Sequence, residues 1–397
     1  MLIGIVGKAN VGKSTFFKAA TLADAEIANF PFTTIKPNHG VGFIRIKCVD
    51  AELDVHCKPK EGFCIKTERF VPVELLDVAG LVPGAYQGRG MGNQFLDDLR
   101  QASVLIHIVD ASGSTNEMGE PVQPGTNDPV KDVLFLEEEL DMWYFQILKK
   151  SWDKFSKQAK MEHIEAEKAI AKQFSGLNVT EAIVKNLTKG LNLNEMDAAA
   201  WSEEQLKDFA KALRKITKPM LIAANKVDTK EGRANYEILL KEFPDYRIIP
   251  CSAESELALK EAAKLKMIDY IPGNSSFNIL AEESLNQLQK GALDFIRKNI
   301  LDVFKSTGVQ QTLNTAVLEL LNYVAVFPVA NPKLQDQSGN VLPDCFLMPS
   351  NSTAHDLAYK VHTTIGQGFI KAIDMKKKTV VGKEYHLRHR DVIEIVV

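Results

Sequence analysis

The sequence lacks the features of membrane, secreted and strongly basic proteins. No apolar run approaches the roughly 18 residues that a membrane-spanning helix needs, and the first residues have neither the basic flank nor the small-residue cleavage site of a signal peptide. Charge of one sign is not in large excess either, because 48 Lys and Arg residues stand against 51 Asp and Glu residues. We therefore expect a cytoplasmic monomer without membrane or DNA contact, in which any contact with RNA depends on a local basic patch.

Cysteine is scarce, and the five cysteines are an odd number scattered over a long chain. That distribution differs from the disulfide framework of a small secreted domain, so we expect reduced thiols. Cys48, His56, Cys57 and Cys64 are candidates for a metal site, but the tight Cys-x-x-Cys pairs of structural zinc sites are absent. Thiols without a metal are therefore the favoured interpretation of this group.

Length and pattern together predict several domains around a parallel sheet. A chain of 397 residues exceeds what one hydrophobic core usually serves. Short apolar runs with helical stretches between them are typical of a doubly wound α/β sheet, whose ligands bind at the carboxyl ends of the strands. The predicted strands are 2–6, 71–76, 104–109, 220–224 and 247–250.

The interval of about 100 residues between the third and fourth of these strands is too long for an ordinary crossover, so it predicts an inserted domain. Residues 130–174 contain no Pro or Gly, and a second helical stretch covers about residues 203–216. An amphipathic helical pair that packs on itself is the favoured interpretation, and a partner-binding arm is the alternative. The apolar stripe of the first stretch is Val133, Leu134, Leu136, Leu140, Trp143, Tyr144 and Ile147.

The last part of the chain changes from helices at 276–322 to short strands around one helix. Thr353 and Asp356 have the spacing of a capping box at a helix start. The apolar residues that follow, up to Ile365, share one helix face, and the glycines at 366 and 368 are expected to end the helix.

The first predicted strand leads directly into a match to the phosphate-binding pattern G-x-x-x-x-G-K-[ST]. Its glycines allow backbone amides to close around the phosphates, Lys13 reaches the β and γ phosphates, and the Ser14 hydroxyl is placed to bind magnesium. The strand at 71–76 ends at Asp77, which can hold magnesium through water, and the Gly80 amide can sense the γ-phosphate. The predicted phosphate-binding residues are Gly7, Ala9, Asn10, Val11, Gly12, Lys13, Ser14 and Thr15.

A guanine-reading motif follows the strand at 220–224 and consists of Asn225, Lys226 and Asp228. The Asp228 carboxylate can accept two hydrogen bonds from the guanine N1–H and N2 amine, a donor pair that adenine lacks. Each charged hydrogen bond contributes roughly 1.5 to 3 kcal/mol, so this side chain alone predicts a guanine preference of about 10- to 1000-fold. Ser252 and Ala253 are predicted to complete the base pocket through a backbone amide, and the predicted ligands are GTP or GDP with Mg²⁺.

With these motifs the sequence resembles the Obg-like branch of the translation-factor-class GTPases, the YchF family. Residues 29–38 resemble its first switch, and the resemblance implies that Thr33 or Thr34 closes onto magnesium and the γ-phosphate, with Thr34 carried over as a magnesium ligand. Residues 80–93 resemble its glycine-rich second switch. The predicted catalytic set is Lys13, Thr33, Thr34, Gly80 and Asn10.

The resemblance implies an α/β P-loop GTPase domain with an inserted α-helical domain and a C-terminal TGS domain, a β-grasp fold associated with RNA and ribosome contacts. The predicted boundaries are 1–114 and 217–275 for the GTPase domain, 115–216 for the insertion, 276–323 for connecting helices and 324–397 for the TGS domain.

Three positions bear on activity. Many YchF relatives have lost the guanine-reading aspartate and accept ATP, whereas this chain keeps Asp228, which implies GTP. Leu81 stands where small signalling GTPases have a water-orienting glutamine, so hydrolysis is expected to be slow or to need another group. Asn10 resembles the residue of GTPases that recruit potassium beside the phosphates, and the alternative is a loop-stabilising hydrogen bond. Weaker candidates are Gln87, Asn93 and Arg89, the last of which is favoured as a solvated loop residue.

Two functions stand as hypotheses. In the first, GTP orders both switches, hydrolysis releases them, and the insertion and TGS domain convey the change to a ribosome or RNA. In the second, the chain is a ribosome- or RNA-binding adaptor whose nucleotide serves mainly as a ligand. A metabolic kinase is disfavoured because it explains neither the guanine motif nor Ser252 and Ala253.

Basic residues in the last part of the chain form either a phosphate-facing patch or, at 376–378, a solvated hairpin turn. They are Lys371, Lys376, Lys377, Lys378, Lys383, Arg388 and Arg390.

Overall fold

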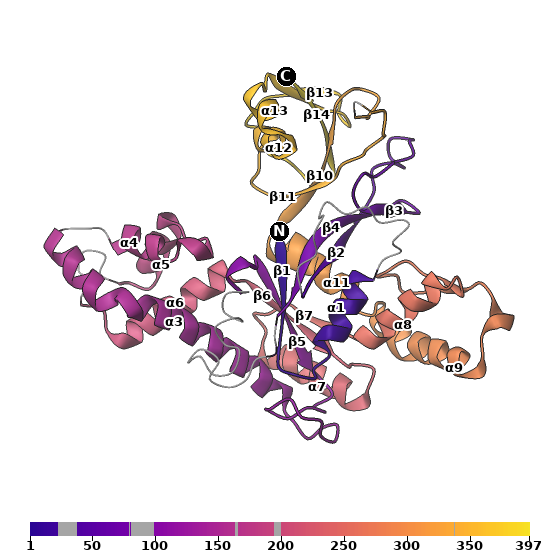
Figure 1. Cartoon of the computed structure of the whole chain (residues 1–397), viewed down its shortest axis with the longest axis horizontal. Coiled ribbons are helices and arrows are strands. Elements are labelled where there is room, and N and C mark those ends of the chain that lie inside the picture. The colour runs from indigo at the N-terminus through magenta and orange to yellow at the C-terminus, as the bar shows by residue number, and fades with distance from the viewer. Residues whose placement is uncertain (23–37, 79, 81–98, 163–165, 194–199, 337) are drawn as a thin grey trace. The chain divides into compact units, whose positions relative to one another are not determined.

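The computed structural model describes residues 1–22, 38–78, 80, 99–162, 166–193, 200–336 and 338–397 (Figure 1). The chain divides into two compact units, each built from two stretches of sequence. Unit 1 comprises Met1–Ser14 and Leu76–Cys251, and unit 2 comprises Thr15–Leu75 and Ser252–Val397.

The sheet of unit 1 is parallel and confirms four of the predicted strands. Strands β1 (Leu2–Val6), β5 (Val104–Asp110), β6 (Met220–Asn225) and β7 (Ile248–Cys251) lie side by side in that order. Almost all of their residues are buried, as expected for strands covered on both faces. Because the strands are parallel, their carboxyl ends share one edge, where the predicted motifs begin.

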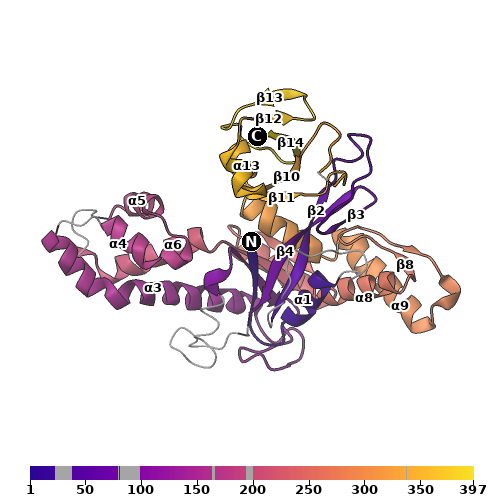
Figure 2. The ribbon, with the colours of Figure 1, turned by 45° about the horizontal axis from the view of Figure 1, so that its top comes forward.

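The inserted part of unit 1 is helical and packs on itself. Its longest helix, α3 (Pro129–Glu162), runs beside α6 (Glu203–Thr217) (Figures 1 and 2). The predicted stripe on α3 is buried apart from Ile147, which is partly buried, and Leu134, which is 51% exposed, so the prediction was wrong for Leu134. No helix in the described ranges is both long and apolar enough to span a bilayer. The remaining helices of unit 1 are α4 (Ala166–Gln173), η2 (Ser175–Leu177), α5 (Glu181–Gly190) and α7 (Lys230–Glu242).

Unit 2 begins with most of α1 (Lys13–Thr21) and three strands. They are β2 (His39–Lys47), β3 (Phe63–Ile65) and β4 (Glu68–Asp77), of which β3 pairs with β4 in antiparallel fashion and the last two residues of β4 belong to unit 1. The helices predicted before the C-terminal sheet are present. The elements of this stretch are α8 (Ala253–Lys264), β8 (Ile268–Asp269), β9 (Asn278–Ile279), η4 (Glu282–Ser284), α9 (Gln287–Ile296), η5 (Arg297–Leu301), α10 (Asp302–Phe304), α11 (Val309–Asn314) and η6 (Thr315–Leu320).

A five-stranded sheet with the order β11-β10-β14-β12-β13 forms the C-terminal part of unit 2. Its apolar face packs on α12, where Leu357 is fully buried against Val326 and Ile393. The predicted capping box of Thr353 and Asp356 is present at the start of α12. The elements are β10 (Tyr323–Val329), β11 (Phe346–Pro349), α12 (Ala354–Val361), α13 (Thr363–Gln367), β12 (Lys371–Asp374), β13 (Thr379–Val381) and β14 (Asp391–Val396).

The single helix predicted up to Ile365 is instead two helices. His362 adopts an extended conformation, with φ −166° and ψ 145°, and its Nδ1 accepts a hydrogen bond from the Thr364 amide. The side chain thus caps a new helix, α13, and competes locally with continuation of α12. The hairpin between β12 and β13 is confirmed, because Asp374 pairs with Thr379 and residues 376–378 lie in the turn.

A buried ion pair joins the two long helices of the insertion. The Arg214 guanidinium, on α6, is 1% exposed and donates to Asp141 at 2.7 Å and Glu137 at 3.2 Å on α3. Both carboxylates are mostly buried, so they depend on this partner for charge compensation.

We expect Arg214→Met to lower the unfolding free energy of this helical region by about 2 to 3 kcal/mol, because it leaves two mostly buried carboxylates without their cation. Tryptophan fluorescence during denaturation measures this region selectively, since Trp143, Trp152 and Trp201 are the three tryptophans of the chain. Lys211→Met, at an exposed position of the same helix, is the matched control. Equal midpoints for the two variants would contradict the expectation.

Candidate nucleotide-binding site

The loop between β1 and α1 requires glycine at two positions. Gly7 has φ 148°, and a Cβ there would lie 2.5 Å from the Ile108 carbonyl oxygen. Gly12 has φ 96°, and a Cβ there would collide with the Asn225 amide. Neither position tolerates a side chain, so the loop backbone can lie close to a phosphate chain.

Lys13 is a buried cation at the centre of this loop. Its Nζ donates to the Lys8 carbonyl oxygen at 2.7 Å, and burial lowers the pKa of Lys13 although Asp77 acts in the opposite direction. Gly80 lies against the same group, because a Cβ on Gly80 would be 3.4 Å from Lys13 Nζ and 3.3 Å from the Ala9 nitrogen. The structure thus brings together Lys13 and Gly80, two residues predicted to contact the γ-phosphate.

The residues predicted to bind magnesium form an incomplete set of oxygen ligands. Ser14 Oγ lies 3.3 Å from Asp77 Oδ2, and Asp77 Oδ1 is buried without a hydrogen-bond partner among the described residues. Burial raises the pKa of Asp77, and the Lys13 charge partly offsets this. A buried carboxylate oxygen beside a hydroxyl fits a hard divalent cation, since such groups are otherwise satisfied by hydrogen bonds.

The switch residues predicted from the sequence lie outside the described residues. They are Thr33, Thr34, Leu81, Gln87, Arg89 and Asn93.

The first two residues of the guanine motif hold the phosphate loop. Asn225 Nδ2 donates to the Val11 carbonyl oxygen at 3.0 Å, and Lys226 Nζ lies 3.4 Å from the Asn10 carbonyl oxygen. The Asp228 carboxylate is half-buried, and none of the hydrogen bonds or ion pairs identified among the described residues involves it. Its two oxygens are therefore available to a ligand with adjacent donors.

Ser252 and Ala253 belong to unit 2 and directly follow β7 in the chain. The Ser252 amide donates to the Thr307 carbonyl oxygen at 2.9 Å, and its hydroxyl donates to Ser255 at 2.8 Å. Helix α8 begins at Ala253, so the backbone there carries the partial positive charge of a helix N-terminus.

Sequence reasoning missed the segment after β5. Asp110 is fully buried and accepts hydrogen bonds from Lys226 Nζ at 2.8 Å, Ser114 Oγ at 2.9 Å and Thr115 Oγ1 at 3.0 Å. Burial raises the pKa of Asp110, but the hydrogen bonds from Lys226 and Ser112 outweigh it and leave the pKa below its ordinary value. The position of Asp110 at the end of an apolar run, like that of Asp77, was the signal available in the sequence.

The segment after β5 also contacts the phosphate loop through Lys8 and Asn10. Lys8 forms a buried ion pair with Asp132 at 2.7 Å and donates to the Thr115 carbonyl oxygen at 2.8 Å. Asn10 Nδ2 donates to the Gly119 carbonyl oxygen at 2.8 Å, which is the loop-stabilising role proposed as an alternative to potassium binding. Residues 110–132 are therefore part of the surroundings of the nucleotide site.

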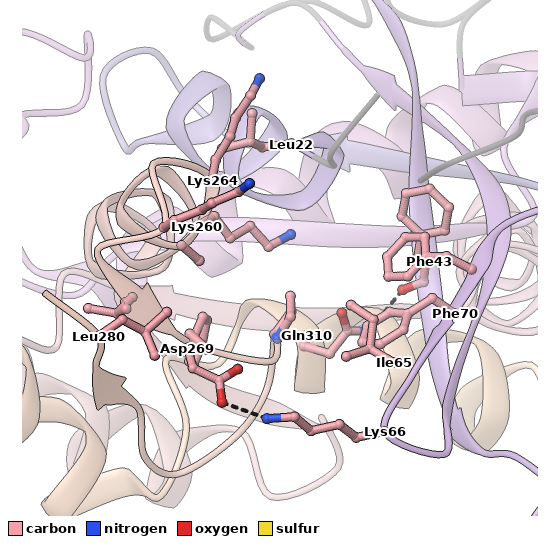
Figure 3. Close-up of a pocket in the computed structure, with 16 residues that line it drawn as sticks. Leu22, Phe43, Ile65, Lys66, Phe70, Lys260, Lys264, Asp269, Leu280 and Gln310 are labelled. Atoms are coloured by element: carbon pink, nitrogen blue, oxygen red, sulfur yellow. Dashed lines mark hydrogen bonds and ion pairs between the residues drawn. The ribbon is translucent and has the colours of Figure 1, made fainter. Parts of the chain in front are cut away.

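A cavity of about 440 Å³ lies within unit 2 (Figure 3). Phe43, Ile65 and Phe70 form an apolar wall, and Lys66, which lines it too, pairs with Asp269 at 2.5 Å. None of its 16 lining residues belongs to the phosphate or guanine motif. The nucleotide site is thus defined by converging loops and not by this cavity.

Comparison with known proteins identifies the family. The model of the 50S ribosome-binding GTPase matches residues 2–135, that of the Obg-like GTPase YGR210-like, G4 motif-containing domain matches 223–331, and that of the TGS domain matches 338–397. An uncharacterised GTP-binding protein of Methanocaldococcus jannaschii is 50% identical over the whole chain and 98% of its own length. The chain belongs to the Obg-like GTPase family.

Two further relatives extend the comparison. The crystal structure of a GTP-binding protein from Pyrococcus horikoshii OT3 is 41% identical, with a TM-score of 0.79 over 100% of this chain and 99% of that one. The ribosome-binding ATPase YchF of Buchnera aphidicola is 26% identical over 99% of this chain and 98% of its own length. The predicted YchF-type fold, with its P-loop and TGS domains, is confirmed for this Obg-like GTPase.

We expect Asp110→Asn to weaken GDP binding by about 10-fold or more, because the loss of one charged hydrogen bond costs about 1.5 to 3 kcal/mol. Lys226 would then no longer be held beside the phosphate loop. Isothermal titration calorimetry with GDP measures the change. Glu117→Gln removes the same charge from an exposed position of the same segment and serves as the control. An affinity for the Asp110 variant within twofold of the control would show that this network does not support the site.

Proposed function

We propose that this Obg-like GTPase hydrolyses GTP to GDP and phosphate and uses the cycle as a conformational switch on a ribosome or RNA. The observation that carries the proposal is the Asp228 carboxylate, which has no partner among the described residues while Asn225 and Lys226 of the same motif are engaged with the phosphate loop. Because Asn225 and Lys226 contact the phosphate loop, the Asp228 carboxylate is the group of this motif that is left to bind a base.

Guanine is the base that matches this carboxylate. Its N1–H and N2 amine present two donors to the two oxygens of Asp228, whereas adenine presents an acceptor at N1. A bound base would cover this half-buried carboxylate, and a covered carboxylate without donors is costly, so the site would disfavour adenine as well as favour guanine. Relatives include both proteins named GTP-binding and proteins named ATPase, and the presence of Asp228 assigns this chain to the GTP users.

Ser14 and Asp77 would hold a magnesium ion, with Thr34 as the further ligand expected from the sequence. Mg²⁺ at this place would neutralise charge on the β and γ phosphates. Lys13 supplies a second positive charge, and its burial keeps that charge in a weakly screened environment where it acts strongly on developing negative charge.

Positioning of the attacking water is not provided by residue 81, because a leucine side chain has no hydrogen-bonding group. Asn10 is the residue through which a potassium ion would act, since its amide nitrogen is bonded to Gly119 and its carbonyl oxygen Oδ1 is the atom suited to a cation. A monovalent cation there would offset transition-state charge as an arginine finger does.

The ribosome is proposed as the partner on three grounds. The family model that matches residues 2–135 is that of a 50S ribosome-binding GTPase, and the Buchnera relative is named ribosome-binding. In the TGS domain several basic side chains are already paired, since Lys376 and Arg390 contact Glu52 and Lys377 contacts Asp374. Those left exposed for a phosphate backbone are Lys371, Lys378, Lys383 and Arg388.

An adaptor with negligible turnover is the second candidate, favoured by the leucine at position 81. The two candidates differ in whether the partner raises turnover or only binds according to the nucleotide present.

Asp228→Ala is expected to reduce the preference for GDP over ADP by about 10- to 1000-fold, because each lost charged hydrogen bond contributes about 1.5 to 3 kcal/mol. Competition binding with fluorescent GDP measures both affinities. Asp245→Ala removes an exposed aspartate elsewhere in unit 1 and should leave the preference intact. An unchanged preference in the Asp228 variant would show that the base is read elsewhere.

Ribosomes are expected to raise GTP turnover of the full chain by at least about 10-fold, and more in potassium than in sodium, because the chain itself lacks a water-orienting side chain at position 81. Phosphate release is measured with and without 70S ribosomes in each salt. Turnover that ribosomes leave unchanged, with GTP-dependent cosedimentation, would favour the adaptor. Neither stimulation nor cosedimentation would remove the ribosome as partner.

A further inference from the structure

Three cysteines and an aspartate converge in unit 2. The ligand atoms of Cys48, Asp50, Cys57 and Cys64 all lie within 4.8 Å of one another. Cys48 directly follows β2, Cys64 lies in β3, and the other two lie in the loop between these strands. His56, which the sequence offered as a further candidate, is not a member of the group.

The local fold brings these side chains together. The Cys48 amide donates to the Thr67 carbonyl oxygen at 2.8 Å, which fixes the end of β2 beside the turn that follows β3. The Val55 amide donates to the Asp50 carbonyl oxygen at 3.0 Å and bends the loop back on itself. Gly62 has φ 69°, and a Cβ there would collide with the Phe70 carbonyl oxygen, so a glycine is needed where the chain enters β3.

The group is enclosed and has few other partners. Cys48 is 1% exposed and Asp50 is 7% exposed, while Cys57 and Cys64 are half-buried. Cys64 Sγ lies 3.9 Å from Asp50 Oδ2, a spacing at the limit of a weak S–H hydrogen bond. Four groups able to carry negative charge are costly to crowd together in a buried place unless a cation joins them.

We propose that Cys48, Asp50, Cys57 and Cys64 bind one zinc ion in tetrahedral geometry. Zinc–sulfur distances of about 2.3 Å and zinc–oxygen distances of about 2.0 Å imply ligand separations of about 3.5 to 3.8 Å. The observed separations are at most 4.8 Å, and that between Cys64 Sγ and Asp50 Oδ2 is 3.9 Å, so side-chain rotations would complete the site. A disulfide would use two of the sulfur atoms and leave the third beside Asp50, and an iron–sulfur cluster would need the ligands further apart because each binds a different iron.

Arg69 offsets the charge of this site. One Zn²⁺ with three thiolates and one carboxylate has a net charge of −2, and the Arg69 guanidinium is buried close enough to act electrostatically on Cys57. Its terminal nitrogens donate to the carbonyl oxygens of Leu342 and Pro343 at 3.2 and 2.8 Å, and its Nε has no partner among the described residues. Metal-bound thiolates are commonly stabilised by donors of this kind.

Zinc would hold the segment on which the TGS domain rests. The Lys58 amide donates to the Val341 carbonyl oxygen at 2.8 Å, Lys60 pairs with Asp336 at 2.7 Å, and Lys376 pairs with Glu52 at 2.8 Å. The loop that carries Cys57 thus bonds at several points to loops that connect strands of the C-terminal sheet. Fixing this loop to β2 and β3 through a metal rigidifies the support of that domain.

Metal content of the full chain tests the proposal. The untagged protein is purified after exposure to excess Zn²⁺, gel-filtered, and measured by inductively coupled plasma mass spectrometry. We expect about one zinc per chain, and a loss of most of it in Cys57→Ser and Cys64→Ser. Cys345→Ala and Cys251→Ala are the matched controls and should keep the metal, because neither residue belongs to the group.

Cobalt substitution tests the ligand set directly. Co²⁺ in the native chain should show thiolate-to-cobalt charge transfer and the intense visible bands of tetrahedral coordination, and both should be lost in Cys57→Ser. GDP affinity, which concerns a separate set of residues, verifies that each variant is folded. Chelation should lower the thermal midpoint of the wild-type chain by at least about 4 °C and leave that of the double variant Cys57→Ser, Cys64→Ser unchanged.

Several outcomes would overturn the proposal. They are a native chain without zinc after exposure to excess metal, a disulfide between two of the three cysteines in the non-reduced peptide map, labile sulfide with iron in place of zinc, and equal metal loss in Cys345→Ala.

Discussion

The ion pair between Asp110 and Lys226 supports the geometry of the nucleotide site. Asp110 ends β5, Lys226 follows β6, and their 2.8 Å contact joins two neighbouring strand ends while Lys226 also approaches the Asn10 carbonyl oxygen. Asn225 adds a second tie through Val11. Because parallel strands place their carboxyl ends at one edge, residues more than 100 positions apart in the sequence can brace the loop, whose own Lys8 and Asn10 side chains add further contacts. The loop is therefore held by side chains from neighbouring strand ends as well as by its own.

The three lysines around this loop have different partners. Lys8 is neutralised by Asp132 and Lys226 by Asp110, whereas Lys13 donates to a backbone carbonyl oxygen. Burial without a strong counter-charge lowers the pKa of Lys13, and an anionic ligand beside its Nζ would raise that pKa again. Lys8 and Lys226 thus stabilise the fold through ion pairs, whereas Lys13 is available to an anionic ligand. Burial of the His107 side chain, together with the charges of Lys13 and Lys8, lowers the pKa of His107 to about 3. His107 therefore stays neutral and adds no further positive charge beside these lysines.

Sequence reasoning succeeded where the constraint is local and failed where it is distant. Gly7 and Gly12 were found because the tight turn after β1 requires glycine at both positions within a short motif, whereas the base contact of Asp228 stays a prediction. Asp132 was missed because its partner Lys8 is 124 residues away, and no pattern on α3 distinguishes it from a solvated charge. The break at His362 was missed because a capping side chain overrode an uninterrupted helical pattern. The interpretation of the cysteines depended on recognised zinc spacings, which do not include a carboxylate two residues after the first cysteine.

The phosphate loop and the cysteine group each hold groups of one charge sign close together for a ligand of the opposite sign. At the phosphate loop, a buried cation and glycine-lined backbone amides are assembled in advance of an anion; at the cysteine group, thiols and a carboxylate are assembled in advance of a cation. In both, strands hold part of the ligand set, which reduces the chain entropy lost on binding. The two sites differ in how readily their ligands exchange. A nucleotide held through hydrogen bonds and a labile magnesium ion can exchange, whereas thiolate-bound zinc would be released only on unfolding or chelation. The proposed switch would benefit from such a fixed point, because a domain that conveys a conformational change needs a rigid support.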